Sequence, residues 1–280
     1  MRQFLAGLKK EILFFVRGFR LPGVIIGFVA SALFSPLLFG LMGFMADMDL
    51  GLEEAGMGEM SGMFAMYQGE SGFQLSYIAT LDSFAGLIAL VPIIVMAVLM
   101  GTAGKEQKKR SIIMPRTAGL TPAGHILPKF VLYPPLMFVL TVGSLFLSNA
   151  VSYPIFGVAF SVGQAALVGS LAGLAVMFLV SLHLFLGNAL AQPGLSIIYV
   201  LAGNMVISLV LTMAFEVTAF TPFNLMGMAS SIVMNGSSAL DTTEMIATMA
   251  ITAALCVIFM LLTLFAMVAK KVDNTADEVY

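Results

Sequence analysis

Side chains that build covalent or reactive sites are scarce in this chain. Its 280 residues include one cysteine, Cys256, and two histidines, and tryptophan is missing altogether. A single cysteine within an apolar run excludes a disulfide framework and any cysteine-based metal cluster. Without tryptophan, anchoring at a membrane surface falls to tyrosine, phenylalanine and basic side chains.

Motifs for nucleotide or calcium binding are also missing. Residues 101–105 suggest a phosphate-binding loop, but Leu99 stands where its first glycine is required and Glu106 replaces the hydroxyl residue after its lysine. The acidic segment that begins at Asp47 fails the EF-hand pattern, for example at Gly51, where Asp or Asn belongs. Since no hydrolase motif is present either, we expect no enzymatic activity, cofactor or metal site in this chain.

Charge is the third scarcity. Only 10% of the residues are charged, whereas 60% are hydrophobic and the mean hydropathy is +1.02. Runs of about 18 or more apolar residues indicate bilayer spans, so we expect a single all-α membrane domain over residues 1–280. Six spans are predicted, at about 23–46, 75–100, 131–151, 162–186, 195–215 and 245–269.

Residues 2–20 carry too much charge to span a membrane. On a helix, Lys9, Arg17 and Arg20 fall on one side, which predicts an amphipathic helix lying in the membrane interface with its cations toward the headgroups. The opposite side is apolar: Leu5, Leu8, Ile12, Phe15 and Phe19. A Pro-Gly pair at 22–23 is expected to break this helix before the first span.

The basic residues decide the predicted orientation. All 13 Lys and Arg fall within residues 2–20, the loop 101–130 and residues 270–271, which lie on one side of the six predicted spans. The segments 47–74 and 216–244, on the other side, contain acidic residues and no basic ones. Because basic residues favour the inner side, both termini are expected in the cytoplasm, with the protein in the cell membrane.

Three ionisable residues fall at membrane depth. Asp82 lies about two turns into the second span, and Glu216 lies at the outer end of the fifth. Such groups are costly in lipid and often line a pathway, so both are candidates for a translocation pathway or outer gate; alternatively, they sit at headgroup level facing water. His183, in the fourth span, is expected to be a hydrogen-bonded packing residue.

Two further patterns concern packing. Gly23 and Gly27 are four residues apart, as are Ala165, Gly169 and Gly173, a spacing that lets helices approach closely. Methionines also recur every third residue in the segment 47–74, at Met57, Met60, Met63 and Met66. Their thioethers could bind Cu(I), or they could simply stack on one side of a short helix.

The loop 101–130, which we call the central loop, is the densest block of charge in the sequence. Within it, Thr121 can cap a short helix, Pro122 suits its first turn and Pro128 is expected to limit its extension. The loop is therefore expected to be a compact structure held between two spans, rather than a flexible linker.

Several elements of this loop occur together. A small-residue patch at 101–104 precedes Glu106 and the basic residues 108–110; the segments 112–115 and 117–124 follow, and Lys129 opens the third span. Together with the amphipathic leader, the six spans and the sequence at 221–224, these elements resemble the permease subunits of ABC-2 type ABC transporters.

The resemblance implies a type V exporter-like fold that works as a pair, with a second copy or a paralogue in the lipid bilayer and without nucleic acid. Two copies of a separate ABC ATPase, which holds ATP and Mg, would drive export of a hydrophobic or amphipathic peptide, drug or lipid. The segment after the fifth span would form short re-entrant helices, with Asn224 at the outer gate. The residues implied in ATPase coupling are Glu106, Arg110, Pro115, Arg116, Gly119, Thr121, His125 and Lys129.

Two alternatives remain open from the residues. One is an ion-coupled secondary transporter that uses Asp82 and Glu216. The other is a copper-handling or assembly factor built around the methionine-rich segment.

Overall fold

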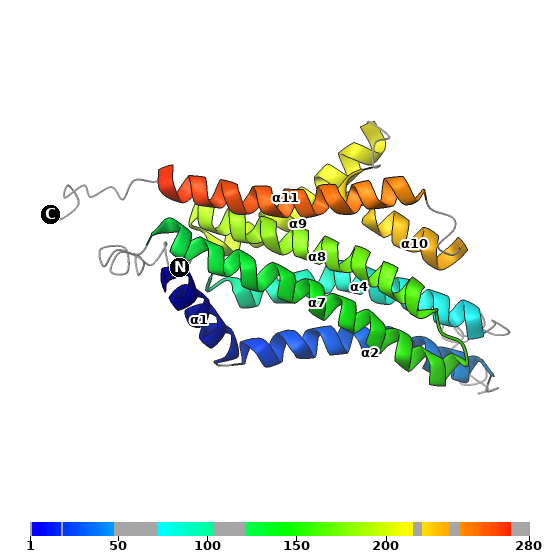
Figure 1. The fold of residues 1–280 in the computed structure, drawn as a ribbon. Helices are drawn as coiled ribbons and strands as arrows, with labels where there is room; N and C mark the ends of the chain where they lie inside the picture. Colours follow the sequence, from blue (N-terminus) through cyan, green and yellow to red (C-terminus); the bar gives the residue numbers. More distant parts are fainter. Residues whose placement is uncertain are drawn as a thin grey trace, which may run out of the picture.

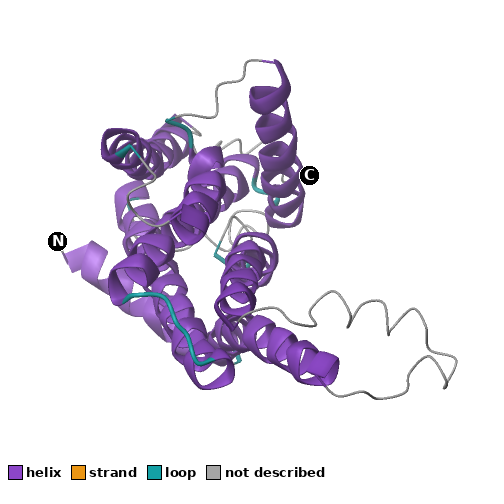
Figure 2. Cartoon of the chain, turned by 90° about the vertical axis from the view of Figure 1, so that its right-hand side faces the viewer, coloured by secondary structure: helices purple, strands orange, loops and turns teal. Residues whose placement is uncertain are grey.

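The computed structural model describes residues 2–17, 19–47, 72–102, 121–214, 220–235 and 241–269. These residues form helices and a few short turns, and no strand occurs among them (Figure 2). The elements in chain order are α1 (Arg2–Val16), α2 (Arg20–Asp47), α4 (Gly72–Leu99), α7 (Pro122–Phe156), α8 (Val162–Leu190), α9 (Pro193–Ala214), η1 (Pro222–Asn224), α10 (Leu225–Asn235) and α11 (Thr242–Ala269).

The long helices form a bundle around α8 (Figure 1). Helix α8 packs against α7, α11, α9, α4 and α10, and 72% of its most apolar stretch is buried, against 22% for α11. Helix α1 lies at an angle to the bundle, at the end where α11 finishes (Figure 1). The outward faces of α2 and α11 carry exposed Phe, Leu, Ile and Val, as expected of helices that meet lipid.

Five helices are long and apolar enough to cross a membrane: α2, α4, α7, α8 and α11. This supports the predicted all-α, multi-pass membrane protein. The remaining predicted span, at about 195–215, corresponds to α9, in which the fully described apolar stretch is Gly194–Gly203.

The expected break at 22–23 is wrong. Helix α1 ends at Val16 and α2 already begins at Arg20, so Pro22 falls in the first turn of α2. Proline is well tolerated there because it has no backbone N–H, and a backbone N–H in the first turn would have no intrahelical acceptor. Arg20 fixes this elbow: its guanidinium stacks over the Phe14 ring and donates to the Phe14 carbonyl at 2.8 Å.

The short helix expected to stop at Pro128 is also wrong. Thr121 does cap a helix, since its Oγ1 accepts from Gly124 N, but this helix continues through Pro128 to Phe156. A proline in a helix interior costs about 3 kcal/mol. Burial of the following turns, including Phe130 and Tyr133, offsets that cost. The lever expected as a separate piece is therefore the first turns of a 35-residue helix.

Glycines set the closest approach in the bundle. A Cβ on Gly173 of α8 would lie 2.7 Å from the Phe138 ring of α7, and one on Gly169 would lie 3.5 Å from the Val142 Cα. The predicted close contact at this small-residue series is therefore confirmed. At the other pair, only Gly27 has a near neighbour, Ile94, and Gly23 has open space around it.

Candidate functional site

The two borders of the central loop are joined by a buried lysine. Thr102 follows the end of α4, and Lys129 lies two turns into α7. Lys129 is fully buried, and its Nζ donates to the Thr102 carbonyl at 2.8 Å. The Thr102 hydroxyl in turn donates to the Leu99 carbonyl, closing the end of α4. A buried hydrogen bond thus joins the described residues on the two sides of this loop.

The same lysine belongs to a polar series on one side of α7. His125, Lys129 and Tyr133 are four residues apart, a spacing that places them on one face of a helix. Lys129 Nζ lies 3.1 Å from His125 Nε2. This distance fits a hydrogen bond between the two groups, in which Nε2 accepts when the imidazole proton lies on Nδ1.

Tyr133 extends this series to the amino-terminal helix. Its hydroxyl donates to Glu11 Oε2 at 2.8 Å, and its ring meets Phe15 edge-on. Glu11 is 2% exposed, and Lys10 lies 3.8 Å from its other carboxylate oxygen. An acid buried this fully needs such partners, because an unpaired carboxylate in an apolar interior is strongly disfavoured. Helix α1 is therefore locked to α7 through Glu11.

Helix α1 has three faces rather than the expected two. Gly7, Glu11 and Phe15 lie against α7, while the expected apolar residues Leu5, Ile12 and Phe19 are exposed. The cationic side, with Lys9, is exposed as well. The exposed apolar and basic faces still suit a membrane interface, but the strip between them is used for packing within the chain.

Two further contacts tie α1 to the loop borders. Thr121 Oγ1 lies 2.9 Å from Gln3 Oε1, which joins the start of α1 to the start of α7. At the other border, a Cβ on Gly101 would lie 2.6 Å from the tip of the Phe14 ring. Helix α1 consequently touches both ends of the loop.

The predicted coupling residues are placed in two groups. Glu106, Arg110, Pro115, Arg116 and Gly119 lie outside the described residues. Of the others, Thr121 is exposed, whereas His125 is 6% exposed and Lys129 is fully buried. The two buried residues are thus placed to hold the loop borders in position, and Thr121 is the one accessible to a docking partner.

The predicted pathway residues do not form one cluster. Glu216 lies outside the described residues. Asp82 lies ten residues after the start of α4, because the helix begins three residues before the predicted span, and it accepts from Ser35 Oγ at 2.6 Å. At the end of the bundle opposite α1, Asn224 Nδ2 donates to Glu244 Oε1 at 3.1 Å, which ties η1 to the first turn of α11.

Helix α10 occupies the region where the resemblance implies short outer helices. It is 11 residues long and packs on α8 and α4 through Leu225, Ala229 and Ile232, which are fully buried. Gly227 lies beside Asn224, with 3.0 Å between its potential Cβ and the amide oxygen. Asn224 therefore serves as a fixed corner between η1, α10 and α11.

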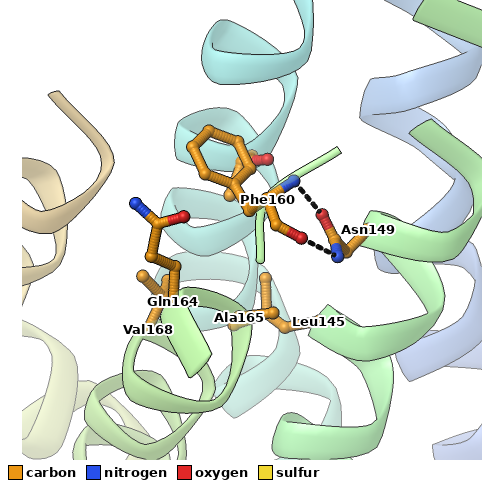
Figure 3. Close-up of a pocket in the computed structure, with 7 residues that line it drawn as sticks. Leu145, Asn149, Phe160, Gln164, Ala165 and Val168 are labelled. Carbon is orange, nitrogen blue, oxygen red and sulfur yellow. Dashed lines mark hydrogen bonds between the residues drawn. The ribbon is translucent and has the colours of Figure 1, made fainter. Parts of the chain in front are cut away.

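A small cavity lies at this same end, between α4, α7 and α8 (Figure 3). Asn149 borders it and clamps the backbone of Phe160, with hydrogen bonds of 2.9 Å to its N–H and 3.0 Å to its carbonyl. The cavity volume of about 10 Å³ is enough for roughly one water molecule. It is therefore part of the turn between α7 and α8 and too small to hold cargo.

His183 has the packing role expected from the sequence. It is fully buried, and its Nδ1 lies 3.0 Å from Ser196 Oγ, which joins α8 to α9. Among the described residues, no group of His, Cys, Asp and Glu could hold a metal ion. The methionine-rich segment lies outside them.

Sequence reasoning missed Glu11, Tyr133, Thr102 and Ser35. Glu11 did leave a signal: at about 100° per residue it lies roughly 180° from Arg2, at the edge of the apolar side of the leader, where an acid is out of place. The four-residue spacing that links His125, Lys129 and Tyr133 was another signal. Thr102 and Ser35 left none, because their roles depend on contacts between helices far apart in sequence.

Replacement of Gly7 with alanine is expected to loosen α1. The new Cβ would lie 2.6 Å from the Gly124 carbonyl and 2.8 Å from the Pro128 ring, so α1 must move away from α7. Helix propensity alone would favour the change by about 1 kcal/mol, so the sign of the effect separates packing from propensity. Hydrogen exchange of the α1 amides should accelerate by about tenfold or more. The control is Gly163→Ala, where the Cβ meets nothing within 4 Å; unchanged exchange in Gly7→Ala would contradict the close contact.

Comparison with protein-family models, with curated proteins and with solved structures found no match to this chain.

Proposed function

We propose that this chain is the membrane permease subunit of an ATP-driven ABC-2 type exporter. In this proposal, a separate ATPase subunit hydrolyses ATP, and the chain works as a pair to move a hydrophobic or amphipathic peptide, drug or lipid out of the cell. The observation that carries the proposal is the clamped base of the central loop, where Lys129 joins Thr102 and Glu11 joins α1 to α7.

The physical reasoning concerns transmission of force. A loop that swings freely on its spans would absorb a push from a partner as local motion. Here both borders of the loop rest on α1 and on each other, through the Gln3–Thr121 and Phe14–Gly101 contacts. A displacement of the loop would therefore move α4, α7 and α1 together, and α7 packs on α8 at the centre of the bundle.

The proposed membrane arrangement follows from the charge distribution. We assign α9 as a further span, the fifth of six in chain order, and the α1 end of the bundle to the cytoplasm. Every Lys and Arg of the chain lies within residues 2–20, the loop 101–130 or residues 270–271. The exposed apolar faces of α2 and α11 then meet lipid or the second permease copy. Helix α10 lies at the outer end.

The test is the partner and its activity. Tagged protein purified from its native membrane is expected to bring an ABC ATPase with it. In the complex, the charge-reversed variant Arg110→Glu/Arg116→Glu should lower transport-linked ATP hydrolysis by roughly tenfold or more, because two like charges at a docking surface cost several kcal/mol. The matched control, Lys270→Glu/Lys271→Glu, reverses two charges on the same predicted side outside the loop. The proposal fails if no ATPase co-purifies, or if both variants hydrolyse ATP at the wild-type rate.

An ion-coupled secondary transporter is the second candidate, and Asp82 is the observation that favours it. A carboxylate within a span is a common proton or ion relay. Purified protein in vesicles would then drive uptake from an ion gradient without ATP, and Asp82→Asn would abolish that uptake.

The copper-handling alternative is tested by titration of Cu(I) into a peptide covering residues 45–66. Absence of binding would exclude this alternative.

A further inference from the structure

Asp82 lies well within the apolar length of α4, far from either end of the helix. At 1.5 Å per residue, its ten-residue separation from Gly72 places it roughly 15 Å from the outer end of α4. Helix α4 is about 40 Å long and exceeds a 30 Å hydrocarbon core by only about 5 Å at each end. Its partner Ser35 is twelve residues from the end of α2 at Asp47, roughly 18 Å, which gives the same depth independently.

The carboxylate faces outward from the bundle. Asp82 is exposed on the described chain, whereas Ser35, which donates to it at 2.6 Å, is buried. This hydrogen bond holds the Asp82 side chain in a fixed orientation against α2. Ile78, Gly86 and Ile93 share this side of α4, so an acidic group is set among apolar and small side chains.

Among the residues that the structure describes, Asp82 has no ion pair with a basic side chain, and no Lys or Arg occurs near it in the sequence. Every Lys and Arg lies in residues 2–20, 101–130 or 270–271, and Thr102, where the central loop starts, is twenty residues along from Asp82, roughly 30 Å. A second copy of the chain has the same distribution and offers no cation at this level. A carboxylate in lipid without a counter-charge is costly, so its partner must come from outside the chain.

The site is too poor in ligands for a metal ion. Hard cations take six or more oxygen ligands, whereas Asp82 and Ser35 supply a carboxylate and a hydroxyl that is already donating. No cluster of acidic or histidine side chains joins them among the described residues. An organic cation needs only one carboxylate and gains from the apolar surface around it.

We infer that Asp82, held by Ser35, is the binding group for a positively charged, apolar cargo, such as a lipophilic ammonium compound or a cationic amphipathic peptide. This inference rests on the proposed transport function, because it names the charge of the cargo. The amine or other cationic group pairs with the carboxylate, while the apolar body lies along α4.

The test is binding of radiolabelled tetraphenylphosphonium to the purified full-length chain, measured by equilibrium dialysis without an ATPase. Wild type should bind saturably, Asp82→Asn should bind at least tenfold more weakly, and Asp82→Glu should stay within a few-fold of wild type. The control Asp241→Asn removes one carboxylate at the outer end of α11 and keeps the side-chain oxygen that accepts from Thr243 N. It should bind like wild type.

Several outcomes overturn the inference. The first is that folded wild type shows no saturable binding of tetraphenylphosphonium. The second is that Asp82→Asn binds it as tightly as wild type does. The third is that wild type binds the neutral analogue triphenylphosphine oxide as tightly as tetraphenylphosphonium. The second outcome would mean that Asp82 is neutral or is satisfied by protein groups. Because no ATPase is present, a negative result refutes the cationic cargo and leaves the coupling test open. Conversely, failure to find an ATPase refutes the proposed function and leaves the binding result standing.

Discussion

Replacement of Lys129 with alanine is expected to lower the free energy of unfolding by about 3 kcal/mol. The lysine is fully buried, and its loss leaves the Thr102 carbonyl and His125 Nε2 without this hydrogen-bond partner in the protein interior. The missing stem adds a cavity between α4 and α7. Both terms act at the base of the central loop, so coupling to an ATPase should fail even where the protein still folds.

Lys129→Met separates these two terms. Methionine keeps most of the volume and removes only the donors, so the expected cost falls to roughly 1–2 kcal/mol. The control is Lys9→Met, because Lys9 is exposed on α1 and should change stability by less than about 0.5 kcal/mol.

The chain contains its own probe for this measurement. Cys256 is the only cysteine and is buried, so a thiol-reactive fluorophore reports unfolding in detergent. The melting midpoints are expected to be highest for the wild type and Lys9→Met, lower for Lys129→Met, and lowest for Lys129→Ala. If Lys129→Ala melts at the same temperature as the wild type, the contacts of Lys129 with Thr102 and His125 do not hold the borders of the loop.

Replacement of Gly173 with leucine is expected to be equally damaging, at about 3 kcal/mol. The first carbon of the new side chain would lie 2.7 Å from the Phe138 ring and 3.2 Å from the Phe138 carbonyl. The Phe138 ring can rotate away, but the Phe138 backbone cannot, so α7 must move away from α8. Helix α8 is the most buried of the five long apolar helices. Membrane helices depend on such close packing because lipid is as apolar as their side chains.

Gly143→Leu is the matched control on the partner helix. Gly143 lies in α7 with nothing within 4 Å of its potential Cβ, so leucine there should point into open space. Both substitutions gain the same helix propensity, about 1 kcal/mol, and this gain cancels in the comparison. Equal melting midpoints for the two variants, measured with the Cys256 probe, would contradict the close packing of α7 on α8.

Long-range composition explains why most of the helices were predictable. Spans of the required length leave runs of apolar residues that no soluble helix needs, and five of them match helices α2, α4, α7, α8 and α11. The boundaries were less certain, since the apolar core of α7, about 131–151, is shorter than the helix itself. Its first turns, from Pro122, contain His125, Pro128 and Lys129 between apolar residues, and burial against α1 stabilises them as helix.

The two errors in helix boundaries at prolines have one physical origin. Proline at 22 and at 128 was read as a helix breaker, yet Pro22 sits in a first turn and Pro128 in a helix supported on both sides by packing. Local propensity is worth only a few kcal/mol, and buried contacts outweigh it.

The sequence by itself determined the helical class and the segregation of basic residues, because both depend on the kinds of side chain present and on their order. Only the tertiary structure decided that Glu11 is buried against Tyr133, that Lys129 closes the base of the loop on Thr102, and that Asp82 meets Ser35. Each of these pairs joins residues at least 27 positions apart. Such contacts depend on which helices become neighbours, and hydrophobic periodicity carries no information about that choice.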